Sequence, residues 1–258
     1  MARKWAKFPY PDKAIDRDAA AVKKAWARLH RGDAEPPPKD SAVLDAWTDY
    51  HAGRFADAVE AGLAAGGAGV NAAVKAQAVY ANYLEKNEKA KLALFEEAAN
   101  WADERRAEAP RDANAHYLYA FALGRYSQGI SVAKALAQGF GGRIKEALTT
   151  AIKLEPKHAD AHIAYGAYQA EVIDKVGGIV AGVTYGAKKD SAVEHYEKAI
   201  KLNPESAIAR IEYANGLLLM FGKSKIAEAE KLYKDAAKTV PADAMERLDV
   251  EHAKSELE

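Results

Sequence analysis

The sequence predicts an all-α protein in which pairs of helices stack into a solenoid. Three segments, starting at Pro110, Pro156 and Pro204, can be superimposed: each has Ala three and five residues after the proline, Tyr nine after it and a small residue ten after it. Segments that repeat at intervals of tens of residues are typical of solenoids. Alanine is abundant and β-branched runs are few, which favours helices over any sheet.

Two regions are expected along the chain. Residues 1–40 are predicted to form an N-terminal extension with one helix over about 16–30 and a Pro-rich linker, because Pro36, Pro37 and Pro38 fix three consecutive φ angles and cannot continue a helix. Residues 41–258 are predicted to form the helical repeat domain, in which apolar residues recur with the helical period.

Five helix pairs are expected within the repeat domain. The predicted pairs are two short helices on either side of Gly53, then 71–84 with 88–108, 113–126 with 142–154, 158–173 with 191–202, and 206–221 with 225–239. Ser191 and Glu194 have the spacing of a capping box and predict the start of one of these helices. Residues 242–258 continue as a charged amphipathic helix, as expected of a cap that covers the last repeat.

These features resemble the tetratricopeptide-repeat (TPR) family, whose helix pairs of about 34 residues carry small and aromatic residues at fixed places and a closing proline. The resemblance implies a TPR-like right-handed α-solenoid. The closing prolines lie further apart than one family period in two units, because apolar insertions near 129–141 and 178–186 separate the two helices of those units. With such insertions the chain is similar to divergent repeat proteins that include the T component of TRAP transporters and the regulators of microtubule dynamics.

The resemblance also implies which side chains line the concave groove. In the family, the residues four, seven, eleven and fourteen after the closing proline point into it. Here they are Asn114, Tyr117, Phe121 and Gly124; Asp160, Ile163, Ala167 and Ala170; and Ile208, Ile211, Asn215 and Leu218. The groove is therefore expected to be mostly apolar, with no Lys or Arg at these positions, which disfavours a clamp for the acidic C-terminus of a chaperone.

An apolar groove of this kind has to be covered. The cover could be the chain's own insertions, a segment of a protein or peptide partner, or a small apolar or lipid-like ligand enclosed between groove and insertion. We expect a non-catalytic interaction scaffold or adaptor. The candidate binding residues are Tyr117, Phe121, Ile163, Ile211, Asn215 and Leu218, with Phe140 and Tyr185 as a gate supplied by the insertions.

Other function classes find little support in the sequence. The 37 basic and 37 acidic residues cancel, so no overall field attracts nucleic acid. Cysteine is absent, no nucleotide or hydrolase motif occurs, and no cofactor is expected. His158 and His162 are spaced to chelate a metal on a helix, but no third ligand is evident, so neither a metal site nor an enzyme is expected.

Compartment is predicted from what the sequence lacks. The longest apolar stretch, residues 176–185, is about half the length that a membrane-spanning helix needs. No apolar core of a signal peptide follows the first residues, so a cytoplasmic protein is expected, unless a leader has been removed.

Overall fold

The structure is a computed structural model that describes residues 4–258, and within this range every regular element is helical. The elements are α1 (Ala19–Leu29), α2 (Ser41–His51), α3 (Phe55–Ala65), α4 (Gly69–Tyr83), α5 (Glu88–Glu108), α6 (Ala113–Ile130), α7 (Val132–Ala137), α8 (Phe140–Leu154), α9 (Ala159–Val176), α10 (Gly178–Val180), the π-helix η1 (Ala181–Tyr185), α11 (Lys189–Leu202), α12 (Ala207–Phe221), the 3-10 helix η2 (Gly222–Lys225), α13 (Ile226–Ala236) and α14 (Ala244–Ser255). The all-α solenoid and its five predicted pairs are confirmed.

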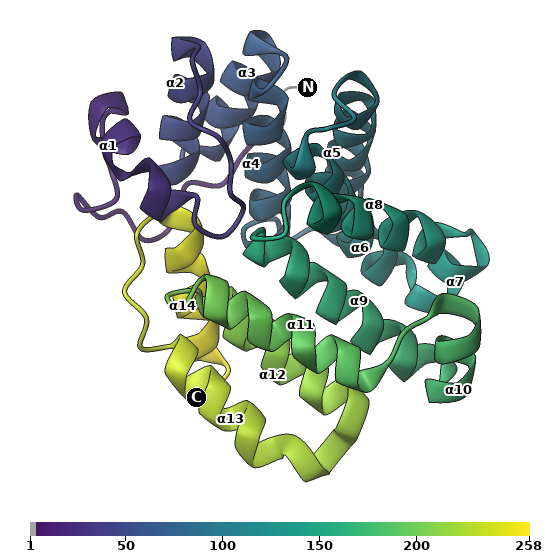
Figure 1. Cartoon of the computed structure of the whole chain (residues 1–258). Coiled ribbons are helices and arrows are strands. Elements are labelled where there is room, and N and C mark those ends of the chain that lie inside the picture. The colour runs from purple at the N-terminus through teal and green to yellow at the C-terminus, as the bar shows by residue number, and fades with distance from the viewer. Residues whose placement is uncertain (1–3) are drawn as a thin grey trace.

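The pairs stack in chain order: α2 with α3, α4 with α5, α6 with α8, α9 with α11, and α12 with α13. Figure 1 shows the first pairs in the upper half of the view and the last pairs in the lower half. The capping helix α14 contacts α12 and α13 of the last pair and α2 of the first pair. Because α14 contacts both ends of the array, the solenoid is closed across its concave side.

Several helices begin where the sequence supplies an N-cap. The side chains of Asp18, Asp40, Asn87, Asp112, Ser206 and Asp243 accept backbone N–H groups at the starts of α1, α2, α5, α6, α12 and α14. The predicted cap at Ser191 is wrong, because α11 already begins at Lys189. The buried Gln169 accepts the N–H of Lys188 at 3.1 Å, which anchors the end of the insertion and sets where α11 starts.

The core is formed largely by alanine and aromatic side chains in two large clusters. One lies among α1 to α5 and includes Leu248 of α14, and the other lies among α4 to α12. Trp101, Phe121 and Tyr126 pack against both clusters and so join the two halves of the molecule. Within the described range, no helix is both long and apolar enough to cross a membrane.

Candidate functional site: the concave groove

The chain's own N-terminal extension occupies one half of the groove. After α1, the backbone crosses the inner ends of α4, α6 and α9. The carbonyl of Gly32 accepts the N–H of Asp160 at 3.0 Å, and the carbonyl of Asp33 accepts the side-chain amide of Asn114 at 2.9 Å. Lys75 donates to the Asp33 carboxylate at 2.5 Å. Backbone contacts of this kind are those expected of a bound extended peptide.

The acidic side chains of this segment are buried. Asp33 and Glu35 are almost fully covered, and Asn71 of α4 donates to Glu35 at 3.3 Å. Lys75 binds the carboxylate of Asp33 and Asn114 binds its backbone carbonyl, so both groove residues contact a segment of the same chain. None of the covers considered from the sequence was this extension. The acidic run before the three prolines was the only signal for it.

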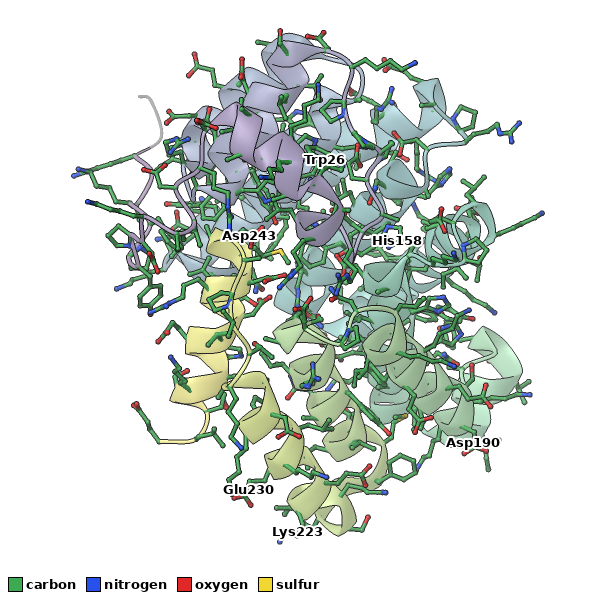
Figure 2. All side chains as sticks on the ribbon, turned by 60° about the vertical axis from the view of Figure 1, so that its left-hand side comes forward. Trp26, His158, Asp190, Lys223, Glu230 and Asp243 are labelled. Carbon is green, nitrogen blue, oxygen red and sulfur yellow. The ribbon has the colours of Figure 1, made fainter. Side chains whose placement is uncertain are left out.

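A linear array of buried side chains continues from this segment to α14. Asp33 contacts Nδ1 of His30 at 2.9 Å, Nε2 of His30 lies 3.1 Å from Nε2 of His51, and Nδ1 of His51 contacts Asp243 at 2.7 Å. All three hydrogen bonds form together only when the two imidazoles and the two carboxyl groups hold three protons between them, one more than two neutral rings carry. Trp26 stacks on His30 with the ring centres 4.0 Å apart, and Figure 2 shows Trp26 and Asp243 in the upper part of the view.

The charges of this buried cluster set the ionisation of its carboxyl groups. Burial by itself would raise the pKa of Asp33, but Lys75 and His30 lower that pKa well below its usual range. Asp160 lies 3.7 Å from Lys75, and burial raises its pKa to about 6 despite that neighbour. Lys75 therefore forms a close ion pair with Asp33 and a longer contact with Asp160.

Next to the occupied half, the groove contains a cavity of about 140 Å³. Tyr117 and Phe121 of α6 and Ile163 of α9 line it, as the sequence predicted for the groove wall. Gly124 of α6 also lines it, and a Cβ atom added there would meet no atom within 4 Å. The other side is formed by residues of the first insertion and α8, namely Val132, Ala135, Leu136, Gly141, Ile144 and Leu148.

The cavity wall also contains charged groups that the sequence mapping missed. Arg125 forms a 2.6 Å ion pair with Glu212 of α12, and Tyr83 donates to Asp249 of α14 at 2.5 Å. Burial raises the pKa of Asp249 well above its usual range. The expectation of a wall without Lys or Arg is thus corrected, because Arg125 is one residue beyond the last position considered and Lys75 lies in a pair with no preceding closing proline.

The remaining candidates from α12 lie outside the cavity. Ile211 is buried in a cluster with Val250 and Ala253 of α14 and Ala236 of α13. Asn215 accepts a hydrogen bond from Tyr233 of α13 at 2.6 Å, and Leu218 is partly exposed at the surface. Of the four α12 positions carried over from the family, only Ile208 lines the cavity, and Glu212, which was not among them, lines it as well.

The predicted gate of Phe140 and Tyr185 is not formed around the cavity. The Phe140 ring lies 6.3 Å from that of Tyr126 and 5.6 Å from the Arg143 guanidinium. Tyr185 ends the second insertion, where its carbonyl accepts Lys145 at 2.7 Å. Residues 176–187 do not line the cavity, and Figure 1 shows α10 at the outer end of α9. Of the two similar insertions, only the first lines the cavity.

The two histidines that have the spacing of a chelating pair, His158 and His162, make other contacts. His158 caps α9: its Nδ1 accepts the N–H of Ala161 at 3.0 Å, and its Nε2 lies 3.0 Å from the Asn114 amide oxygen. His162 instead contacts His195 at 2.7 Å through Nδ1, and its Nε2 lies 3.2 Å from the Pro156 carbonyl. Among residues 4–258, no group of three or more possible ligands is arranged to hold a metal ion.

The stacked pairs and the peptide-like contacts in the groove define the class: a TPR-like helical repeat protein. The structure is similar to the crystal structure of a thermophilic TPR protein from Thermus thermophilus, with a TM-score of 0.57 and 17% sequence identity over 83% of this chain and 98% of that one. The chain belongs to the family described as regulator of microtubule dynamics protein 1-3, whose model matches residues 71–258. No curated protein sequence matches it.

Proposed function

We propose that the protein is a non-catalytic interaction scaffold that binds an extended partner segment in the cavity half of its groove. The observation that carries the proposal is that the same concave surface already holds residues 32–35 through backbone and carboxylate contacts. Rigid helices present the binding side chains, so little ordering entropy is lost when a partner binds. In cells, we expect this scaffold in the cytoplasm.

The size of the cavity limits what can enter it. An apolar cavity of about 150 Å³ in an engineered protein holds one benzene molecule. The present cavity of about 140 Å³ therefore suits one aromatic side chain between Phe121 and Ile163. The acyl chain of a lipid is much larger, so a fully enclosed lipid-like ligand is disfavoured, whereas a ring-sized ligand remains the second candidate.

The charges around the cavity indicate which residues should flank that aromatic side chain. Two basic residues, Lys75 and Arg125, line it, and both are already paired with acidic groups. Glu171 and Asp249 also line it, and burial raises the pKa of each above its ordinary value. A cation nearby would favour the ionised form of both carboxyl groups. The preferred segment is thus an aromatic residue next to Lys or Arg.

The test uses a matched pair of glycine substitutions in the full chain. Gly124→Leu should fill the cavity, whereas Gly142→Leu adds the same side chain to α8 at an exposed position with equally open surroundings. The probe is a fluorescein-labelled Gly/Ser peptide with one phenylalanine between a lysine and an arginine. We expect fluorescence polarisation to show binding to the Gly142→Leu protein and at least tenfold weaker binding to Gly124→Leu.

Two companion measurements make the result decisive. A peptide with alanine in place of phenylalanine should bind at least tenfold more weakly, and one with acidic flanks should bind more weakly than the basic one. Equal binding of the peptide by both glycine variants would contradict the proposal. If no peptide binds while toluene raises the melting temperature of Gly142→Leu but not of Gly124→Leu, the ring-sized ligand replaces the partner segment.

A further inference from the structure

The second insertion exposes an apolar tip to solvent. Ile179 and Val183 are 85% and 86% exposed, and Val180 between them is 49% exposed. These three residues, which we call the aliphatic tip, lie on α10 and the π-helix η1. Single exposed apolar residues are common on proteins, but three on consecutive helical turns form a concentrated apolar surface.

The first insertion shows why the second is uncovered. There, the apolar residues of α7 pack against α9, the first helix of the next pair. The helix that follows the second insertion in the stack is α12, which has 15 residues where α9 has 18. α12 ends at Phe221 and turns directly into η2, so it supplies no additional turn over the aliphatic tip.

The tip is held firmly at its base. Ala181 and Ala187 are buried, and the N–H of Ala187 bonds the carbonyl of Ala181 at 3.1 Å. Lys145 of α8 and Gln169 of α9 anchor the last residues of the insertion through the hydrogen bonds described above. The exposed side chains are therefore presented on a fixed base. π-helical turns of this kind often lie at functional sites.

Basic residues outnumber acidic ones in the segments along this edge. The segments 131–146, 174–190 and 222–228, which contain the two insertions and the turn after α12, together carry eight basic and four acidic residues in a chain whose net charge is zero. Lys189 lies 4.7 Å from the Phe221 ring centre and Lys225 lies 6.0 Å from it, so the second insertion and the α12 turn are adjacent. Figure 2 shows Lys223 at the bottom of the view and Asp190 at its lower right.

We propose that this edge docks on an anionic lipid surface, with the aliphatic tip inserted among the acyl chains and the surrounding lysines at the headgroups. Apolar side chains gain from leaving water, and lysines near an anionic leaflet add electrostatic attraction. The interaction is peripheral. It goes beyond the proposed groove function, because neither the tip nor its lysines line the cavity.

Vesicle co-sedimentation of the full chain tests the proposal. The probe is a vesicle of equal parts phosphatidylglycerol and phosphatidylcholine, compared with phosphatidylcholine alone. We expect binding to the anionic vesicle, weakened by 0.5 M salt, and reduced at least tenfold by the double change Ile179→Asp with Val183→Asp. The matched control is Val240→Asp, an aliphatic residue that is 82% exposed outside these three segments, and it should bind like the unchanged protein.

Several outcomes would overturn this proposal. Failure to bind the anionic vesicle would do so, and so would equal loss of binding in the tip and control variants. If the unchanged protein is a dimer by light scattering and the tip variant a monomer, the tip is an interface between copies and the lipid assignment is wrong. The Gly124→Leu protein should still bind vesicles, so this test and the groove test succeed or fail separately.

Discussion

At the scale of single residues, His158 shows how the groove depends on uncharged imidazole. Its Nδ1 accepts a backbone N–H, so a proton on that nitrogen would break the cap of α9. Burial lowers the pKa of His158 to about 3, whereas an unfolded histidine has a pKa near 6.5. The unfolded state therefore binds more protons between these values, and His158 contributes stability above pH 6.5 that is lost as the pH falls toward 3.

The expected result is a shallower pH dependence when His158 is replaced by a cap that does not titrate. Between pH 5.5 and 4.5, where an unfolded histidine is almost fully protonated, His158→Asn should lower the slope of unfolding free energy against pH by about 1.4 kcal/mol per unit. Urea denaturation followed by circular dichroism measures this. His158→Ser should give the same slope as His158→Asn, even if the two variants differ in stability at pH 7. If both variants have the same slope as the unchanged protein, His158 is not the acid-sensitive group.

At the scale of elements, one tyrosine fixes the spacing of three helices. Tyr196 of α11 is fully buried between α9 and α12. A Cβ atom on Gly166 would lie 2.9 Å from its ring, and one on Gly216 would lie 2.6 Å from its hydroxyl oxygen. Gly124, inside the equivalent helix α6, has open space instead.

The two glycines should therefore respond oppositely to the same change. Gly216→Ala should destabilise the protein by about 1–3 kcal/mol through overpacking, although alanine is the better helix former. Gly124→Ala should stabilise it by about 0.5–1 kcal/mol through helix propensity. Chemical denaturation measures both. In a protein that already carries Tyr196→Leu, Gly216→Ala should cost less stability than it does in the unchanged protein. An equal cost in both proteins would argue against this contact.

The helix pairs were predictable because their signals are local. The Pro110, Pro156 and Pro204 segments each start a helix within three residues of the proline, as the superimposed sequences indicate. Whether each insertion is buried or exposed is not set by its local sequence. The first insertion packs against α9, which has 18 residues, whereas the first helix after the second insertion, α12, has 15, and the matching sequences of the two insertions carry no information about this difference.

At the scale of the whole molecule, the two ends of the chain hold the solenoid closed. Arg28 of α1 forms a two-pronged contact with Glu246 of α14, at 2.6 and 2.9 Å. Asp33 and Asp243 end the buried histidine array, so the extension, the first pair and the cap share one polar network. The family match starts at residue 71, yet the residues before it complete the groove of the matched part. Sequence spacing could not reveal this long-range closure.

This closure predicts that the extension stays bound after the chain is cut. A protease site placed within residues 36–39, three of which are exposed, would separate the first segment from the repeats. We expect the two fragments to co-elute in gel filtration. Lys75→Met removes the lysine partner of buried Asp33 and leaves it only the contact with His30, which should destabilise the uncut protein by about 3–5 kcal/mol. In the cut protein, Lys75→Met should cause the N-terminal fragment to dissociate at a lower urea concentration than it does without the substitution.

A second change separates the charge effect from lost packing. Adding Asp33→Asn to Lys75→Met removes the unpaired carboxylate, so the double variant should be more stable than Lys75→Met alone. If the cut fragments separate in plain buffer while the repeats keep their circular dichroism, residues 1–40 are a separable extension, and the contacts across the groove do not hold the solenoid closed. If the two fragments co-elute in the unchanged protein and dissociate at a lower urea concentration in Lys75→Met, the buried charge cluster joins the ends of the array.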